Sequence, residues 1–194
     1  MWAYWEGPCP AWVAACLATL RTAAQGALQL LDREAFEQLR RQGPPEARAL
    51  DLDRLRIAHR ADFIRLYLLR HFGGLWVDAD CLAMQPLAPV LALLHTHETV
   101  GHRERSGLVS NGFLVARPGS RIIEATYARV CALLRARRPL GWTSLGSEPL
   151  SAAVAAHYGS VSAVTYAAAS VFVQTVAAPA EAFMPALVAV LEVP

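Results

Sequence analysis

Segment 62–80 most constrains what this chain can fold into. It reads as the end of a hydrophobic helix, the pair Gly73-Gly74, a short apolar strand and the carboxylates Asp78 and Asp80. A glycine pair with no polar linker ends a helix and lets a strand start at once. The sequence therefore predicts two carboxylates at the end of a buried strand, which is where open α/β sheets bind ligands.

Asp78 and Asp80 are two residues apart, and in an extended chain such residues point to the same side. Two carboxylates on one face repel each other and lose hydration, a cost that a cation or hydrogen-bond donors offset. Mg²⁺ and Mn²⁺ are commonly held by one or two carboxylates together with substrate phosphates. The motif favours a divalent metal site, with a solvated turn or cap as the alternative, because Asp-x-Asp is common.

A second charged pair, Asp62 and Arg65, lies on a helix that we expect over residues 52–72. Residues three apart share one face of a helix and can touch. Taken alone, the pair reads as a surface ion pair of little energetic weight. The hydrophobic residues around it leave little polar surface on this helix, so it should be buried on most sides. A charged pair there is expected to face a ligand or to belong to a network.

The run 61–80 resembles the glycosyltransferases with a DXD-containing sugar-binding region. These include bacterial capsular polysaccharide enzymes, yeast Golgi mannosyltransferases and the glucosylating domains of large clostridial toxins. The opening Tyr-Trp-Glu-Gly-Pro at 4–8, followed by Pro-Ala-Trp-Val at 10–13 and Cys-Leu at 16–17, resembles the first strand and helix of capsular-type members. Weaker similarities follow at 110–113, 146–150 and 183–185.

The resemblance implies a GT-A-type fold, a UDP- or GDP-sugar donor, Mn²⁺ or Mg²⁺, and a glycan or lipid-linked acceptor. It implies that Asp62, Arg65 and Asp78 contact the donor and that Asp80 is the metal ligand. Trp5 would pack on the nucleobase, and a core aromatic is the alternative that the sequence leaves open. No side chain stands out as the catalytic base. Family members of this type retain the anomeric configuration, with the donor's own phosphate assisting.

Two other functions are weighed against this one. Family members usually carry a further His or Asn metal ligand near the C-terminus, but here no His or Asn follows His157. The alternative is therefore a GT-A-like domain that binds nucleotide sugar or glycan without efficient transfer. Haloacid-dehalogenase-type phosphatases also place Asp-x-Asp after a strand, but they need a later acidic pair and commonly a lysine. This chain has no Asp after Asp80 and no lysine.

Weaker candidate sites are polar residues in expected loops. Three histidines could be read as a metal group: His95, His97 and His102. Their spacing fits no structural zinc pattern, so solvated histidines in a loop are favoured. Ser110, Asn111 and Glu148 could face the acceptor, and turn chemistry or helix capping explains each equally well.

Composition bounds the class of protein. The 194 residues fit a single domain over 1–194, and 55% are hydrophobic, which excludes a disordered chain. A net charge of +2 gives no footprint for nucleic acid. All basic side chains except histidine are arginine, which excludes lysine nucleophiles and P-loop chemistry.

The cellular setting also follows from sequence patterns. Four cysteines without Cys-x-x-Cys spacing predict reduced core residues of a cytoplasmic protein. The apolar stretch 11–20 lacks a basic leader, so we expect no signal peptide. The uncharged stretch 158–180 is long enough to cross a membrane, but its polar residues favour two buried strands or a strand and a loop. Peripheral membrane association stays open.

Strands alternate with helices, which predicts an α/β sheet of mostly parallel order flanked by helices. The expected strands are 2–5, 28–31, 75–77 and 108–117. The expected helices are 10–25, 32–41, 52–72, 86–95, 122–138 and one within 146–157.

Overall fold

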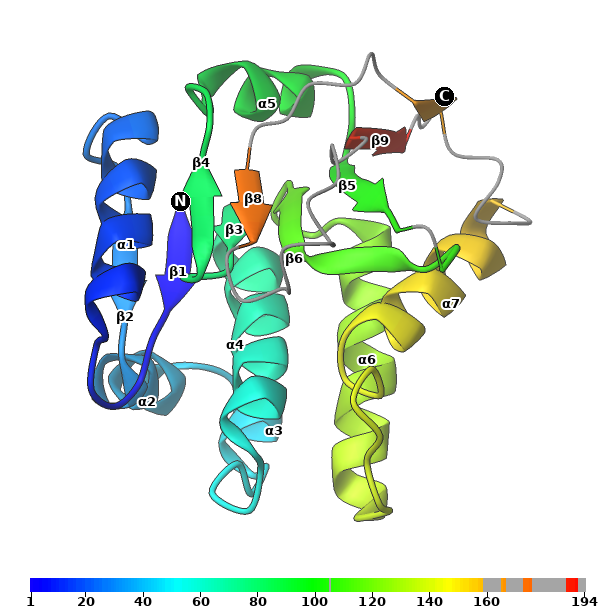
Figure 1. Cartoon of the computed structure of the whole chain (residues 1–194). Coiled ribbons are helices and arrows are strands. Elements are labelled where there is room, and N and C mark those ends of the chain that lie inside the picture. The colour runs from blue at the N-terminus through cyan, green and yellow to red at the C-terminus, as the bar shows by residue number, and fades with distance from the viewer. Residues whose placement is uncertain (105, 159–164, 167–172, 176–187, 192–194) are drawn as a thin grey trace.

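The computed structural model describes residues 1–104, 106–158, 165–166, 173–175 and 188–191. In it, a central sheet carries helices on both faces (Figure 1). The helices are α1 (Ala11–Ala23), α2 (Arg33–Gln42), α3 (Pro45–Arg48), α4 (Ile57–Phe72), α5 (Ala88–Ala92), the 3-10 turn η1 (Leu93–His95), α6 (Arg121–Ala136) and α7 (Ser147–Tyr158). The strands are β1 (Trp2–Tyr4), β2 (Gln29–Leu31), β3 (Gly74–Val77), β4 (Cys81–Ala83), β5 (Thr99–Arg103), β6 (Val109–Ala116), β7 (Thr165–Tyr166), β8 (Val173–Thr175) and β9 (Val188–Leu191).

The main sheet has the strand order β2-β1-β3-β6-β5-β9-β7. Strand β1 pairs in parallel with β2 and β3, whereas β6 pairs antiparallel with both β3 and β5. Strand β9 is antiparallel to β5 and β7, and β4 and β8 form a separate antiparallel pair. The α/β class with a helix-flanked central sheet is confirmed. The parallel order belongs to β2-β1-β3, the part of the sheet that ends at the predicted site.

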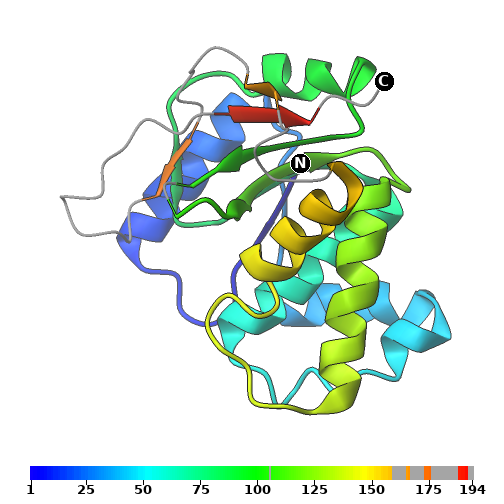
Figure 2. The same cartoon turned by 90° about the vertical axis from the view of Figure 1, so that its right-hand side faces the viewer.

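Side chains of β3 and β6 alternate between two hydrophobic clusters, as a strand period of two requires. Trp76 and Leu114 pack with α4, α6 and α7 on one face. Leu75 and Val115 pack with α1 and α5 on the other. Figure 2 shows α6 (yellow-green) and α7 (yellow) on one side of the sheet and α5 (green) on the other. The chain is therefore layered helix, sheet, helix, and β3 runs between two apolar faces.

Local capping explains why the helices start where they do. The Asp32 carboxylate accepts a hydrogen bond from the Ala35 N–H at 2.8 Å at the start of α2. The Ser120 hydroxyl accepts one from the Ile123 N–H at 3.4 Å at the start of α6. Such side chains satisfy N–H groups that the first helical turn leaves unpaired.

The junction between α4 and β3 depends on Gly73. Its φ of +64° is a conformation that side-chain-bearing residues rarely adopt, and its N–H still bonds to the Leu69 carbonyl at 3.0 Å. A Cβ on Gly73 would lie 2.5 Å from Pro118 Cδ and 2.9 Å from the Ala116 carbonyl oxygen. The helix can therefore stop and the strand begin within one residue because nothing larger than hydrogen occupies this position.

We expect Gly73→Ala to destabilise the fold by about 2 to 4 kcal/mol, because it adds steric overlap with a rigid proline to an unfavourable φ. Chemical denaturation would measure the loss. The matched control is Gly119→Ala, whose φ is also positive (+72°) but whose Cβ would meet no atom within 4 Å. Equal losses in the two variants would contradict the steric part of this explanation.

Several features of the fold differ from the sequence expectation. Helix α4 begins at Ile57 and not near Leu52, because the Leu52 and Leu55 carbonyls accept hydrogen bonds from the Arg60 side chain before the helix starts. The short elements α3 and β4 were not predicted, since neither is long enough to show a period. His102 was expected in a loop but lies in β5.

The C-terminal part is described only in pieces. Strands β7 and β8 fall inside the stretch 158–180, where two buried strands or a strand and a loop were predicted; Tyr158 ends α7, and the other residues of that stretch lie outside the described residues. Among the residues that the structure describes, no helix has both the length and the apolar character needed to cross a membrane.

Candidate active site

A buried guanidinium joins the two carboxylates that the sequence singled out. Arg65 Nη1 lies 2.7 Å from Asp62 Oδ1, and Arg65 Nη2 lies 2.7 Å from Asp78 Oδ1. The Arg65 side chain is 4% exposed, whereas that of Asp78 is 37% exposed. Of the two readings offered by the sequence, a surface ion pair and a network, the structure shows the network. It presents the Asp78 carboxylate toward solvent.

Trp76 contacts two members of this network, Asp78 and Arg65. Its indole N–H donates to Asp78 Oδ1 at 2.7 Å. The Arg65 guanidinium stacks over its ring, with Cζ 5.0 Å from the ring centroid. Burial lowers the pKa of Arg65, but Asp78 and then Asp62 raise it by more, so the net shift is upward and the group stays charged. Arg65 Nε is buried without a hydrogen-bond partner among the described residues.

Asn111 extends the network onto β6 and α7. Its side-chain N–H donates to Asp62 Oδ1 at 2.7 Å, and its side-chain oxygen accepts from the Ser147 hydroxyl at 3.3 Å. A Cβ on Gly146 would lie 2.2 Å from Asn111 Nδ2, so a larger residue at 146 would displace the Asn111 side chain from this network. Asn111 was considered for the acceptor side or as turn chemistry, and the structure instead ties it to the predicted donor residue Asp62.

Asp80 lies in a turn beyond β3. The Cys81 N–H bonds to the Asp78 carbonyl at 3.1 Å, so the chain bends between the two carboxylates. The expectation of an extended Asp-x-Asp with both side chains on one strand face is therefore wrong. The carboxylates still interact: burial, followed by the charge of Asp78, raises the pKa of Asp80, and Arg65 opposes this. Within the described residues, no group of three or more His, Cys, Asp or Glu side chains is arranged to hold a metal.

Trp5 follows β1, and its ring is neither fully buried nor fully exposed. Its N–H bonds to the Leu31 carbonyl at 3.0 Å, and its indole Nε1 donates to the Pro8 carbonyl at 3.0 Å. The ring meets Trp12 edge to face, with centroids 6.3 Å apart, and Trp12 is 44% exposed. Trp5 also packs against the α1 side of the core. The two readings of Trp5, core aromatic and binding residue, are thus compatible.

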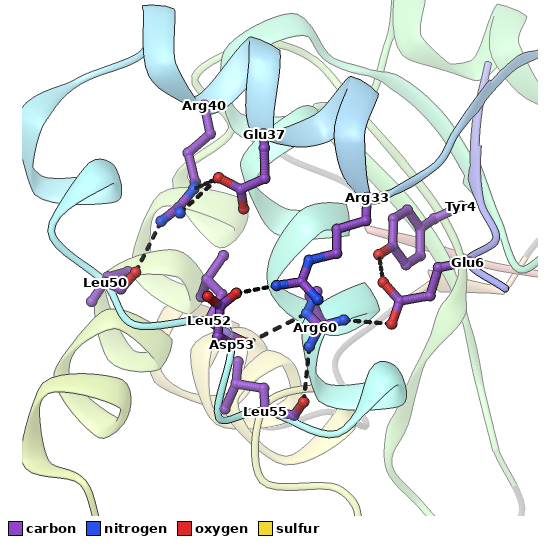
Figure 3. A network of polar contacts seen from close by, with 10 residues as sticks. All are labelled: Tyr4, Glu6, Arg33, Glu37, Arg40, Leu50, Leu52, Asp53, Leu55 and Arg60. Carbon is purple, nitrogen blue, oxygen red and sulfur yellow. Dashed lines mark hydrogen bonds and ion pairs between the residues drawn. The ribbon is translucent and has the colours of Figure 1, made fainter.

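Sequence reasoning missed a second buried polar group near Trp5, formed by Tyr4, Glu6 and Arg60 (Figure 3). The Tyr4 hydroxyl and the Arg60 guanidinium donate to the two oxygens of the Glu6 carboxylate. Burial, then the neighbouring carboxylate, raises the pKa of Tyr4, so its hydroxyl stays protonated and can donate. The available signal was Arg60, a further charged residue beside Asp62 on a helix already expected to be buried on most sides.

The remaining weaker candidates include three histidines and Glu148. His95 lies in η1, His97 in the loop between η1 and β5, and His102 in β5. Across the described part of the chain, no metal-binding group contains them. Glu148 accepts a hydrogen bond from the Thr143 hydroxyl at 2.6 Å, at the start of α7. Of the four free cysteines, three are buried and Cys9 is exposed, so Cys9 is not the core residue that was expected.

Gly112 leaves space for the Asp78 carboxylate. A Cβ on this residue would lie 2.7 Å from Asp78 Oδ2, and its φ is outside the left-handed region. Gly112→Ala should therefore fold normally but displace Asp78 from Arg65. If Asp78 holds a nucleotide-sugar donor, as the sequence resemblance implies, the dissociation constant of that donor should rise about tenfold, the scale of one charge-assisted contact. Titration calorimetry would measure this, with Gly141→Ala as a control away from Asp78; unchanged affinity would show that Asp78 does not hold the donor.

Comparisons with known proteins relate this chain to one family and to one solved fold. Residues 1–138 match the family described as capsular polysaccharide synthesis protein. Among solved structures, the PaToxG glycosyltransferase superimposes with a TM-score of 0.59 at 10% identity, covering 81% of this chain and 68% of that one. Residues 143–194 match a second family, the Na⁺-dependent bicarbonate transporter superfamily, over less than half of the chain. No curated protein matches.

The fold is that of a glycosyltransferase. Since a single family covers residues 1–138, including all five predicted site residues, the chain belongs to the capsular polysaccharide synthesis protein family. Family and fold both relate it to the glycosyltransferases, which confirms the resemblance drawn from segments 4–8 and 61–80.

Proposed function

We propose that this protein transfers a sugar from a nucleoside-diphosphate sugar to a hydroxyl group of a glycan or lipid-linked acceptor, with Mn²⁺ or Mg²⁺ as cofactor. Asp62, Arg65 and Asp78 bind the donor, Trp5 packs on its base, and Asp80 is the protein ligand of the metal. Transfer would retain the anomeric configuration. With a lipid-linked acceptor, the enzyme would act in the cytoplasm at the membrane surface.

The observation that carries the proposal is an imbalance of charge beside the end of β3. Asp62 and Asp78 share the single guanidinium of Arg65, and Asp80 adds a third carboxylate whose pKa is raised by burial and then by Asp78. Burying carboxylates without enough positive charge is unfavourable, and a divalent cation removes the deficit.

The residues present fit a hard divalent cation that is only partly held by protein. One carboxylate, with the diphosphate of the donor and water, can complete an oxygen shell for Mg²⁺ or Mn²⁺. When bound, the metal would neutralise charge on the departing nucleoside diphosphate.

The protein's own residues hold and orient the donor. Arg65 is fixed by two ion pairs and by the Trp76 ring, so its position costs little side-chain entropy on binding. Asp78 is the exposed member of the network and can accept hydrogen bonds from sugar or ribose hydroxyls. Ser110 and Glu148, which lie near the network on β6 and α7, are candidates for contacts to the acceptor.

A thermal-shift panel of UDP-, GDP- and CMP-sugars, each with and without Mn²⁺, tests the donor and metal together. We expect a single nucleotide class to raise the melting temperature, and only when metal is present. Release of nucleoside diphosphate with candidate acceptors then tests transfer. Binding without release would favour the non-transferring alternative, and no metal-dependent shift with any nucleotide sugar would overturn the proposal.

A further inference from the structure

Arg60 connects three separate segments of the chain through one buried guanidinium (Figure 3). It pairs with the Glu6 carboxylate beyond β1, and it donates to the carbonyls of Leu52 at 3.3 Å and Leu55 at 3.1 Å before α4. The side chains of Arg60 and Glu6 are 6% and 13% exposed. Tyr4 donates to the second oxygen of Glu6, so both carboxylate oxygens are used.

The chain contains a second arginine with the same contacts and a purely local role. Arg40 pairs with Glu37 at 2.7 Å and donates to the carbonyls of Ala47 at 3.1 Å and Leu50 at 2.9 Å. Arg40 and its partners lie within residues 37–50, whereas Arg60 reaches across 54 residues to Glu6. A buried ion pair is a poor source of stability, because apolar residues of similar volume do as well. The Arg60–Glu6 pair instead fixes the position of the segment after β1 relative to α4.

The Arg60 cluster determines the position of Trp5. Its neighbours on both sides, Tyr4 and Glu6, are held by the Arg60 cluster. Its own N–H is bonded to Leu31, and the chain turns away at Gly7, whose φ is +88°. The indole is therefore held at the exit of β1 facing the partly exposed Trp12, and Arg60 is two residues before the donor-site residue Asp62 on the same helix.

We infer that Glu6 and Arg60 are positioning residues, which fix the Trp5 indole relative to α4 so that a nucleoside diphosphate is held between Trp5 and the Asp62–Arg65 pair. This inference rests on the proposed function, in which Trp5 packs on the base. Glu6 and Arg60 act through Trp5 and do not themselves contact the donor. Their effect on binding should therefore disappear when the indole is removed.

The test uses Glu6→Gln, which keeps the shape of the side chain. Tyr4 and Arg60 each donate to a different oxygen of Glu6. In glutamine one of these oxygens is replaced by an NH2 group, which cannot accept, so the cluster loses a contact without losing volume. Glu37→Gln is the matched control, since it makes the same change in the Arg40 pair. The chain has five tryptophans, so 5-fluorotryptophan labelling gives five fluorine resonances, and Trp5→Phe assigns that of Trp5.

In the first measurement, fluorine NMR without ligand, Glu6→Gln should shift or split the Trp5 resonance and leave those of Trp76 and Trp142 in place. Glu37→Gln should change none of these three resonances. An unchanged Trp5 resonance in the folded Glu6→Gln variant would overturn the inference, whether or not any nucleotide binds.

The second measurement is the dissociation constant of UDP or GDP with Mn²⁺, taken well below the melting temperature. Glu6→Gln should raise it about five- to twentyfold in the parent and less than about twofold in a Trp5→Ala background. An equal rise in both backgrounds would make Glu6 a general structural residue and overturn the inference. If the parent binds neither nucleotide, or Trp5→Ala leaves affinity unchanged, the base-binding role of Trp5 in the proposed function fails instead.

Discussion

Asp80→Asn is expected to remove metal-dependent donor binding and, at the same time, to raise the melting temperature of the metal-free protein by a few degrees. Burial and the nearby Asp78 charge raise the pKa of Asp80, so the ionised carboxylate destabilises the fold at neutral pH. Because the folded state holds this proton more tightly than the unfolded state, stability falls as pH rises through the folded pKa. Asparagine removes that loss of stability together with the proposed metal ligand.

Titration calorimetry with nucleotide sugar and Mn²⁺ should show affinity lowered by at least about a hundredfold, and melting in EDTA should show the gain in stability. Asp53→Asn is the control, because its side chain is 76% exposed and pairs only with Arg33 among the contacts described. Donor and metal binding equal to the parent would make the metal assignment wrong. A lower melting temperature would show that Asp80 has a stabilising partner.

Arg65→Ala is expected to lower the free energy of unfolding by about 3 to 5 kcal/mol and to weaken donor binding roughly ten- to a hundredfold. From sequence alone this pair would be expected to affect stability little. The structure changes that expectation, because Arg65 is buried between Asp62 and Asp78 and its loss leaves two carboxylates with no cation. Urea denaturation and donor titration on the same samples measure both effects.

Arg33→Ala provides the comparison for Arg65→Ala. Arg33 also pairs with an aspartate, but its side chain is 49% exposed and the pair lies on the surface, so a loss below about 1 kcal/mol is expected. Addition of Asp62→Asn to Arg65→Ala should restore part of the lost stability, since one buried unpaired charge is then removed. No restoration would show that lost packing on Trp76, not charge, is the cause.

The sequence predicted the site elements because their patterns are local. The glycine pair Gly73-Gly74 predicts where α4 ends, because glycine readily leaves the helical conformation. The apolar run after it is long enough to identify β3. The partnership of Asp62 with Arg65 follows from helical spacing alone. The positions of β1, α1, β2, α2, β6, α6 and α7 followed from the same kinds of pattern, with ends that shifted by a few residues.

What the sequence could not predict is contact between distant segments. Nothing local shows that Asn111 meets Asp62 across 49 residues, or that Arg60 meets Glu6 across 54. The antiparallel pairing of β6 with β3 and β5 also depends on the whole sheet, and β5 itself has glycine and histidine where a strand pattern would be apolar. The turn between Asp78 and Asp80 contains no glycine or proline from which it could have been predicted.

The polar chain from Asp78 through Arg65, Asp62 and Asn111 to Ser147 touches β3, α4, β6 and α7 in turn. These continuous contacts should couple the two ends of the network thermodynamically. A ligand that orders Asp78 lowers the entropic cost of ordering Ser147, and the reverse also holds. Occupancy at Asp78 should therefore slow amide hydrogen exchange in the first turn of α7, a segment more than 60 residues later in the sequence. Sugar-donor recognition and the docking of α7 would then form one cooperative unit.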